Sequence, residues 1–351
     1  MKHLKNLLIV IIISIFTFSC SDDLPVDNPY LGDYQNGYFI TNEGPFGTGT
    51  GTLTFINDEN EVVQNAYKTV NNEDLGNIVQ SMTFYNDKAY IVINNSHKVI
   101  VANRYTMKKI AVIEGDAINN PRSFVAIGNK GYISNWGNSS IATDDFIAVI
   151  NLDSNTVTKT IAVGEGPEEM VVSNHKIYVN LQGGYHQNNK VEIIDSTTDA
   201  VSTTLTVGDV PNSLVKDTNG AIWILCGGRP SYVTPETSGS LVKIENEEII
   251  STFNFDGTTN HPNHLTLHAN ELLYNLNGKV YTMANSATEL STTSLDGLDG
   301  FYYAMHAHNN NLYVTTNPYT EEGTLKVFDL STNTENFTTT VGLNPGSIVF
   351  Q

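Results

Sequence analysis

The sequence predicts an all-β protein, a seven-bladed β-propeller, on the strength of three observations. A unit of about 44 residues recurs until the chain ends. Each unit contains four short segments rich in Thr, Val, Ile and Tyr, separated by Asn/Gly turns. No segment shows sustained helical periodicity. Four short strands repeated around an axis are typical of a propeller blade.

Each repeat opens with a short apolar strand, usually just after a proline. The openings with proline are at Pro121, Pro167, Pro211, Pro262 and Pro345. Two further openings, at 80–84 and 303–306, lack the proline. Seven openings predict seven blades. Within a blade, the strands are called A, B, C and D from the channel outward.

The two ends of the repeated region complement each other. The last repeat is only the stub 344–351, which matches a first strand without a continuation. The first repeat starts at 37–42, which matches a second strand, and no first strand precedes it. We therefore expect the C-terminal strand to complete the blade begun at the N-terminus, because such closure removes exposed sheet edges.

The N-terminus has the features of an export signal. Lys2 and Lys5 precede the apolar run 7–18, which is short for a membrane span. The segment up to Cys20 resembles a bacterial lipobox, which implies lipidation of Cys20; the alternative is an ordinary signal peptide with an incidental cysteine. We expect a signal at 1–19, an acylated cysteine with a flexible tether at 20–35, and the propeller at 36–351.

The residues that follow Cys20 indicate a location. Ser21-Asp22-Asp23 resembles the acidic export tag of Bacteroidetes lipoproteins, which implies anchoring in the outer membrane with the propeller facing outward. The chain carries 18 basic and 37 acidic residues, a net charge of −19. Nucleic acid and anionic membrane surfaces are therefore poor partners. The second cysteine, Cys226, lies in an apolar strand and is interpreted as a small buried residue.

The two faces of the disc differ in their loops. Since successive strands are antiparallel, the A–B and C–D turns share one face (the A–B face), and the B–C loops and D–A crossovers share the other (the B–C face). The turns of the A–B face are short and rich in Asn and Gly, as at 86–87, 174–175 and 309–310. We expect that face to be purely structural.

The B–C loops are longer, and each has an aromatic residue beside Gly, Asn or Gln. These loops are 42–49, 135–140, 182–188, 227–232 and 317–320. Aromatic faces and amides together suit a large polar organic ligand, a sugar or a protein loop. The candidate ligand-binding residues are Phe46, Trp136, Tyr185, His186, Arg229, Tyr232 and Tyr319, together with His306 on a first strand that lines the channel.

Catalytic and metal-binding motifs are absent from the sequence, including G-x-S-x-G, HExxH, the P-loop and paired CxxC. The densest histidines are His261, His264, His268, His306 and His308. On a strand, residues four apart are about 13 Å apart, too far to share one ion. We therefore expect a protein that is not an enzyme and has no metal or cofactor.

The strand endings resemble a known repeat. Segments 132–135, 178–180 and 313–316, with 191–195 and 206–208, resemble the YVTN repeat of YncE-like seven-bladed propellers. Combined with the lipoprotein signal, the chain is similar to the BtuG-type cobalamin-binding lipoproteins. That resemblance implies capture of a corrinoid at the cell surface for a TonB-dependent transporter. No BtuG ligand motif matches, so the resemblance supplies no binding residue.

Two other functions remain open on the sequence. The same face suits a surface adaptor that binds a protein or a glycan without a small ligand. A metal-dependent hydrolase or lyase with its site at the channel mouth is the third possibility, because propeller enzymes assemble their sites from several blades.

Overall fold

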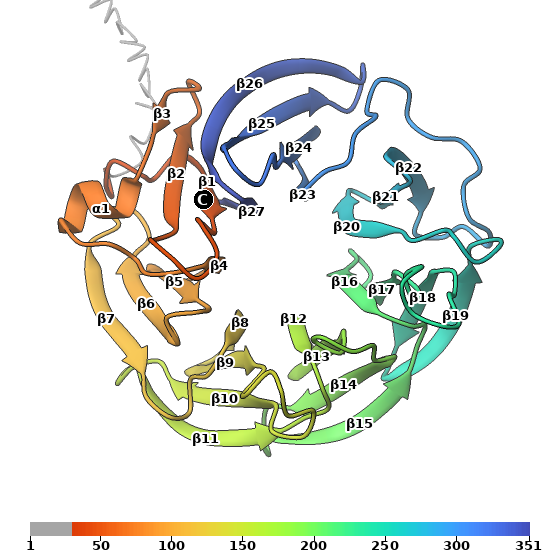
Figure 1. Ribbon diagram of the computed structural model, residues 1–351, viewed down its shortest axis with the longest axis horizontal. Helices are drawn as coiled ribbons and strands as arrows, with labels where there is room; N and C mark the ends of the chain where they lie inside the picture. Colours follow the sequence, from red (N-terminus) through yellow and green to blue (C-terminus); the bar gives the residue numbers. More distant parts are fainter. Residues whose placement is uncertain (1–29) are drawn as a thin grey trace, which may run out of the picture. The chain divides into compact units, whose positions relative to one another are not determined.

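The computed structural model describes residues 30–351, and the predicted export signal and Cys20 lie outside this range. Residues Gly32–Gln351 form one compact unit. Seven β-sheets are arranged in a ring around a central axis (Figure 1). The predicted seven-bladed β-propeller is therefore confirmed. Within residues 30–351, no helix is both long and apolar enough to span a bilayer.

The first four blades each contain four antiparallel strands. Blade 1 contains β27 (Pro345–Phe350), β1 (Gly37–Asn42), β2 (Thr52–Asn57) and β3 (Val62–Val63). Blade 2 contains β4 (Val79–Tyr85), β5 (Lys88–Ile93), β6 (Lys98–Asn103) and β7 (Lys109–Glu114). Blade 3 contains β8 (Pro121–Ile127), β9 (Lys130–Asn135), β10 (Phe146–Asn151) and β11 (Thr156–Ala162). Blade 4 contains β12 (Pro167–Ser173), β13 (Lys176–Leu181), β14 (Lys190–Asp195) and β15 (Ala200–Thr206).

Of the remaining blades, blades 5 and 7 have four strands and blade 6 has three. Blade 5 contains β16 (Pro211–Lys216), β17 (Ile222–Cys226), β18 (Ser240–Glu245) and β19 (Glu248–Asn254). Blade 6 contains β20 (Asn263–His268), β21 (Glu271–Leu276) and β22 (Lys279–Ala284). Blade 7 contains β23 (Ala304–His308), β24 (Asn311–Thr316), β25 (Glu322–Asp329) and β26 (Thr334–Leu343). An isolated bridge between Tyr281 and Ser294 stands where the fourth strand of blade 6 would be.

The ring closes as the sequence predicts. Strand β27 pairs antiparallel with β1, with Phe350 opposite Tyr38 and Ile348 opposite Ile40. The Gln351 side-chain amide donates a hydrogen bond of 2.6 Å to the Tyr34 carbonyl. Tyr34 is itself buried, so the ring begins a few residues before position 36, inside the segment that the sequence assigns to the tether.

The repeat signature has a structural reason at the end of the B strands. The Asn94 side chain donates to the Pro121 carbonyl at 3.1 Å, and that of Asn180 donates to the Pro211 carbonyl at 3.0 Å. Each of these carbonyls belongs to the opening of the next blade. The strand-end amide therefore satisfies a buried backbone acceptor and joins neighbouring blades.

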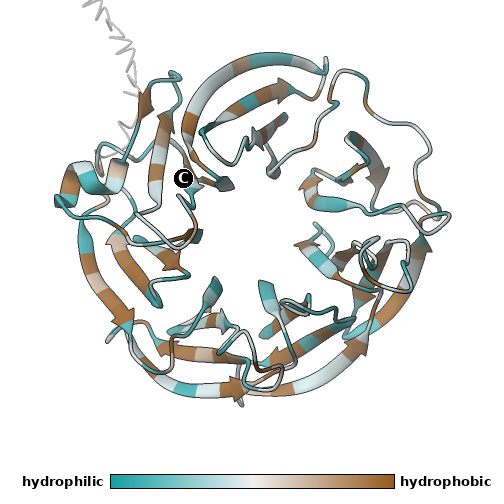
Figure 2. Cartoon of the chain, viewed as in Figure 1, coloured by the Kyte–Doolittle hydropathy of each residue, from teal (hydrophilic) through white to brown (hydrophobic). Residues whose placement is uncertain are grey.

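The core consists of seven apolar layers, one between each pair of adjacent blades. Apolar residues occur in the strands of every blade (Figure 2). Half-buried and exposed residues alternate along the outer strand β15, whereas the inner strand β17 is buried throughout because apolar layers cover both sides of the blade. Between blades 2 and 3, Tyr90 stacks on Phe124 with ring centroids 4.0 Å apart. Cys226 is fully buried in its layer, which confirms its interpretation, and burial raises the pKa of its thiol to about 12.

The tight turns of the A–B face adopt the expected backbone. Both central residues have positive φ at Asn174-His175 (48° and 63°) and at Asn309-Asn310 (45° and 61°). Such pairs match the twist of the flanking strands, and Asn tolerates this conformation well. A longer D–A crossover, between blades 1 and 2, carries the short helix α1 (Ala66–Asn71).

Candidate functional site

The B–C face carries the exposed aromatic residues that the sequence predicts. Phe46, Tyr185, Tyr232 and Tyr319 expose between 69% and 85% of their surface. Large apolar side chains that remain this exposed are available to contact a ligand or a partner. Trp136 is half-buried, which gives it a fixed position among its neighbours.

The inner strands present polar side chains to the same face. Pairing of β8 with β9 and of β12 with β13 shifts register just after the opening proline. Such a bulge re-aims the side chains that follow it. Arg122 and Glu168 occupy this position in blades 3 and 4, and Gln80 occupies it in blade 2.

Arg122 joins three blades at the channel mouth. Its Nε lies 2.8 Å from Glu168 Oε2, and a guanidinium nitrogen donates to Gln80 Oε1 at 2.7 Å. Its guanidinium carbon lies 4.4 Å from the centre of the Trp136 ring. The ion pair, the hydrogen bond and the cation–π contact together fix the guanidinium in one orientation.

Trp136 and Tyr185 extend this arrangement outward. Their ring centroids are 5.9 Å apart in a T-shaped contact. Two loops of different blades thus form one aromatic surface supported from below by Arg122. This is the arrangement in which flat faces can stack on an organic ligand.

Blades 1 and 7 contribute a second group. The Tyr303 hydroxyl donates to Glu43 Oε2 at 2.9 Å, and the Tyr303 ring lies 6.0 Å from that of Tyr319. The positive charge of Arg122 also favours the ionised form of Glu43. We call Glu43, Gln80, Arg122, Trp136, Glu168 and Tyr303 the mouth cluster.

The mouth cluster and its neighbours are strongly acidic. Burial raises the pKa of Glu168, and Arg122 opposes that rise. Burial also raises the pKa of Glu43. The buried Asp145 accepts a hydrogen bond of 2.6 Å from the Gly166 amide, and desolvation followed by nearby acids raises its pKa to about 6. Cationic and hydrogen-bond-donating groups are therefore favoured over anions at this face.

Other predicted site residues lie elsewhere on the face. His186 pairs through Nδ1 with Glu165 Oε1 at 2.6 Å, and Arg229 Nε lies 3.2 Å from Asp209 Oδ2. Phe46 and Tyr232 have no ring contact with the mouth cluster among the described residues. The structure thus brings Trp136, Tyr185 and Tyr319 to the mouth cluster and leaves the rest around the rim.

His306 lines the central channel. The channel contains a cavity of about 350 Å³, lined also by Glu169, Asn212, His264 and Ser347. Burial, with His308 nearby, lowers the pKa of His306 to about 4, so the imidazole is neutral at pH 7. The Glu169 side chain is exposed to the channel. The surrounding protein nevertheless desolvates its carboxyl group, which raises its pKa to about 7. Among residues 30–351, no group of three or more His, Cys, Asp or Glu side chains converges on a point that would suit a metal ion.

The sequence interpretation missed five members of the mouth cluster: Glu43, Gln80, Arg122, Glu168 and Tyr303. A signal for three of them was present. When the repeats are aligned, the second residue of the A strand differs widely between blades. Gln80, Arg122 and Glu168 occupy that position. Glu43 and Tyr303 carry no such signal, because only the ring brings blades 1 and 7 together.

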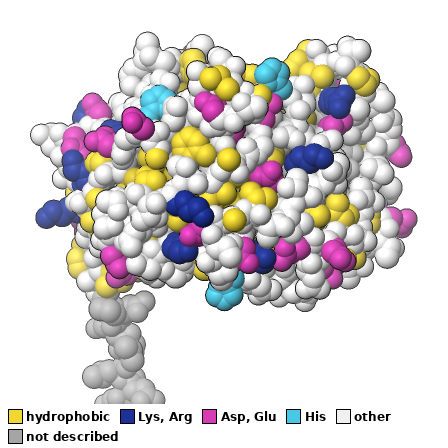
Figure 3. Space-filling view, turned by 90° about the horizontal axis from the view of Figure 1, so that it is seen from below, with side chains coloured by type: hydrophobic (Ala, Val, Ile, Leu, Met, Phe, Trp, Pro, Cys, Tyr) yellow, Lys and Arg dark blue, Asp and Glu magenta, His cyan; other side chains and the backbone are white. Residues whose placement is uncertain are grey.

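The A–B face, for which the sequence predicts a purely structural role, also contains a cavity. A cavity of about 520 Å³ opens on that face between blades 7 and 1. On the side wall of the ring, apolar side chains are mixed with acidic and basic ones (Figure 3).

Solved structures share this architecture. A quinoprotein alcohol dehydrogenase-like protein from Bacteroides thetaiotaomicron superposes with a TM-score of 0.63 at 16% identity, over 90% of this chain and 78% of that one. Hydrazine synthase from Kuenenia stuttgartiensis gives a TM-score of 0.59 at 12% identity, over 91% and 99%. The computationally designed Ika8 protein gives 0.60 at 11%, over 91% and 98%. At these identities the likeness concerns the fold alone.

A search of curated proteins found no match. A family model described as a domain of unknown function, DUF5074, matches residues 36–340, which is nearly the whole ring. The chain therefore belongs to the DUF5074 family of seven-bladed β-propellers.

Proposed function

We propose that this protein is a non-enzymatic binding lipoprotein of the cell surface that captures a large polar organic ligand on its B–C face. The observation that carries the proposal is the aromatic pair Trp136–Tyr185, supported by Arg122 over the channel mouth. Because Arg122 is held by Glu168 and Gln80, the platform is organised before a ligand arrives, which lowers the entropic cost of binding.

A corrinoid is the specific ligand we propose. It is a broad macrocycle bordered by amide groups, and it is wide enough to reach aromatic residues on several blades at once. The exposed rings of Tyr185 and Tyr319 supply flat contacts, while Glu43 supplies an acceptor for amide N–H groups. Acylation of Cys20 would keep the propeller at the outer membrane, where a TonB-dependent transporter would receive the ligand.

The direct test is calorimetric titration of the purified protein, without its signal, with cyanocobalamin. We expect binding in the nanomolar range or tighter. The triple variant Trp136→Ala, Tyr185→Ala and Tyr232→Ala should lose binding and keep the thermal transition of the wild type. Phe301→Ala, which removes an equally exposed aromatic residue outside the proposed set, serves as the matched control.

Each result decides a different part of the proposal. Unchanged affinity in the triple variant would remove the site assignment. No heat at high micromolar cobalamin would remove the corrinoid. In that case a surface adaptor for a protein or glycan becomes the better function, since exposed aromatic residues around a polar centre also suit such partners.

A further inference from the structure

The clefts between adjacent blades on the A–B face are closed by a repeated device. In blades 2, 3 and 4 the first residue of the B strand is a lysine, and it reaches the C–D turn of the next blade. Lys88 Nζ donates to the Leu152 carbonyl at 2.8 Å, and Lys176 Nζ lies 3.1 Å from Glu247 Oε1. Each lysine thus places an ammonium group in the cleft.

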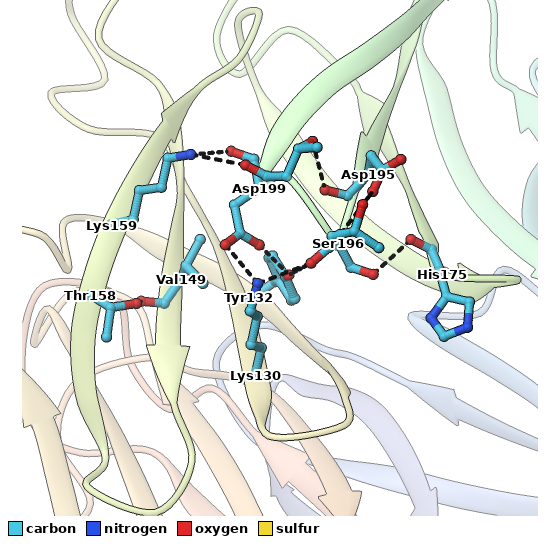
Figure 4. A network of polar contacts seen from close by, with 11 residues as sticks. Lys130, Tyr132, Val149, Thr158, Lys159, His175, Asp195, Ser196 and Asp199 are labelled. Atoms are coloured by element: carbon cyan, nitrogen blue, oxygen red, sulfur yellow. Dashed lines mark hydrogen bonds and ion pairs between the residues drawn. The ribbon is translucent and has the colours of Figure 1, made fainter.

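Blade 3 shows the device in full (Figure 4). Lys130 Nζ lies 2.7 Å from Asp199 Oδ2 and donates to the Ser196 carbonyl at 3.0 Å. The Tyr132 hydroxyl donates to the other oxygen of the same carboxylate at 2.7 Å. The carboxylate and the carbonyl thus contact the ammonium group, and the tyrosine hydroxyl holds the carboxylate.

In the cleft between blades 7 and 1, the first residue of the B strand is not a lysine. Strand register identifies the equivalent residue, because the first B-strand residue faces the last residue of the C strand in every case. These pairs are Lys88–Asn103, Lys130–Asn151, Lys176–Asp195 and Asn311–Asp329. Asn311 therefore stands where blades 2, 3 and 4 have lysine; Gly37 and Glu271 stand there in blades 1 and 6. Tyr313 stands where blade 3 has Tyr132.

The acceptors for a cation are nevertheless in place. Asp58, in the C–D turn of blade 1, lines the cavity and is exposed, and it has no ion pair with any described residue. Its charge acts on both neighbouring phenols. Burial, then Tyr313 and Asp58, raises the pKa of Tyr38, and burial followed by Asp58 raises that of Tyr313. The Tyr38 side chain is 6% exposed, and its buried hydroxyl has no hydrogen-bond partner within residues 30–351.

The other walls of the cavity consist of aromatic rings and side-chain amides. The Phe350 ring packs edge-on against Tyr313 at 4.8 Å and stacks on His308 at 4.0 Å. Burial lowers the pKa of His308, which keeps its imidazole neutral at pH 7. Asn36, Asn60 and Asn336 line the rim of the cavity of about 520 Å³. No lysine or arginine lines this cavity.

We propose that this cleft is a second binding site, separate from the B–C face, which takes a small molecule carrying a protonated amine. The ammonium group would pair with the Asp58 carboxylate inside this cavity. The aromatic walls favour a cation further, and the amide rim accommodates hydroxyl or amide groups elsewhere on the ligand.

The first experiment asks whether the cleft accepts an ammonium group at all. Asn311→Lys supplies one from the chain itself, and it should raise the melting temperature by about 2 °C or more. The gain should vanish when Asp58→Asn is combined with it, since the two changes form a double-mutant cycle. An equal effect of Asn311→Lys with either residue at position 58 would overturn the proposal.

The second experiment uses n-butylammonium chloride as the probe and n-butanol as its neutral counterpart, at constant ionic strength. We expect n-butylammonium to raise the melting temperature of the full chain and n-butanol to leave it unchanged. Affinity should fall about tenfold or more in Asp58→Asn and in Asn311→Lys. Asp87→Asn, which removes an exposed carboxylate from a turn of the same face, should bind as the wild type does. The same response to both probes, or an equal response in all four proteins, would overturn the site.

Discussion

The channel mouth and the cleft between blades 7 and 1 depart from the repeat in opposite ways. At the mouth, the variable position holds Arg122 and Glu168, and the two side chains satisfy each other at 2.8 Å. In the cleft, the equivalent of Lys130 is Asn311, and the carboxylate of Asp58 is left without an ion pair among the described residues. At the mouth, the charged groups are paired and aromatic surface is exposed. In the cleft, a carboxylate remains without a cationic partner among the described residues.

This difference matters for recognition. A satisfied polar cluster adds little attraction of its own, but it holds the rings of Trp136 and Tyr185 in place for a ligand. An unpaired carboxylate beside one buried and one half-buried phenol attracts a cation directly. A repeat protein can therefore carry two kinds of site, and each is found by asking where a blade differs from its neighbours.

The largest effect on stability is expected from removing the strand that closes the ring. Removing 344–351 takes away β27, exposes the edge of β1 and opens the apolar layer between blades 7 and 1. We expect loss of the cooperative unfolding transition, measured by circular dichroism. Ser347→Ala, which removes only the hydroxyl 2.7 Å from Thr41 Oγ1, should melt close to the wild type. A truncated chain that melts within a few degrees of the full chain would show that β27 does not close the ring.

The second-largest effect is expected at the channel mouth, where Arg122 and Glu168 form an ion pair. Arg122→Ala leaves Glu168 half-enclosed and unpaired, and we expect a loss of about 2–4 kcal/mol in the free energy of unfolding. Urea denaturation measures it. Arg229→Ala breaks the more exposed pair with Asp209 and should cost about 0–1 kcal/mol. Equal losses in the two variants would mean that the mouth cluster is no better organised than the rim.

The third effect concerns pH at the acidic border of the mouth. The pKa of Asp145 is about 6 in the folded chain, above its ordinary value, so its contribution to stability is full near pH 4 and is lost as the pH rises through 6. Asp145→Asn cannot ionise, and its amide oxygen can still accept from Gly166. It should match the wild type near pH 4 and exceed it by about 2–3 kcal/mol at pH 7. Urea denaturation at both pH values measures this, and a difference that does not change with pH would contradict it.

The smallest effect compares two equivalent positions in the clefts. Lys130→Ala removes the pair with Asp199 and should cost about 0.5–1 kcal/mol. Asn311→Ala loses only two exposed hydrogen bonds, with Asn336 and the Asn309 carbonyl, and should stay within about 0.5 kcal/mol of the wild type. Thermal denaturation of the two variants side by side measures the contrast. A larger loss at Asn311 than at Lys130 would mean that the closing cleft is already held together by its own side chains.

Much of the fold was predictable because the repeat is local. The opening prolines, the Asn/Gly turns and the strand-end Asn residues each act within a blade or on the next one, as Asn94 does on Pro121. The stub 344–351 was informative for the same reason, since it matched a strand that the first blade lacked. The three-stranded blade 6 was not predicted, because a missing outer strand leaves the inner repeat pattern unchanged.

The candidate sites were predictable only in part. The aromatic loop residues could be assigned to one face from strand direction alone, but no sequence pattern joins Glu43 to Tyr303, which are 260 positions apart and hydrogen-bonded. The vacant lysine position at Asn311 could be found in the sequence, yet its partner Asp58 comes from the other end of the chain.

The sequence by itself determined the architecture of this protein: seven blades, the strand that closes the ring, the tight turns on one face and the aromatic loops on the other. These depend on short-range rules of turn chemistry and alternation, which each blade obeys separately. Only the tertiary structure decided which side chains meet at the channel mouth and which carboxylate stays unpaired. Those outcomes depend on contacts between blades, and it is closure of the ring that brings the ends of the chain together.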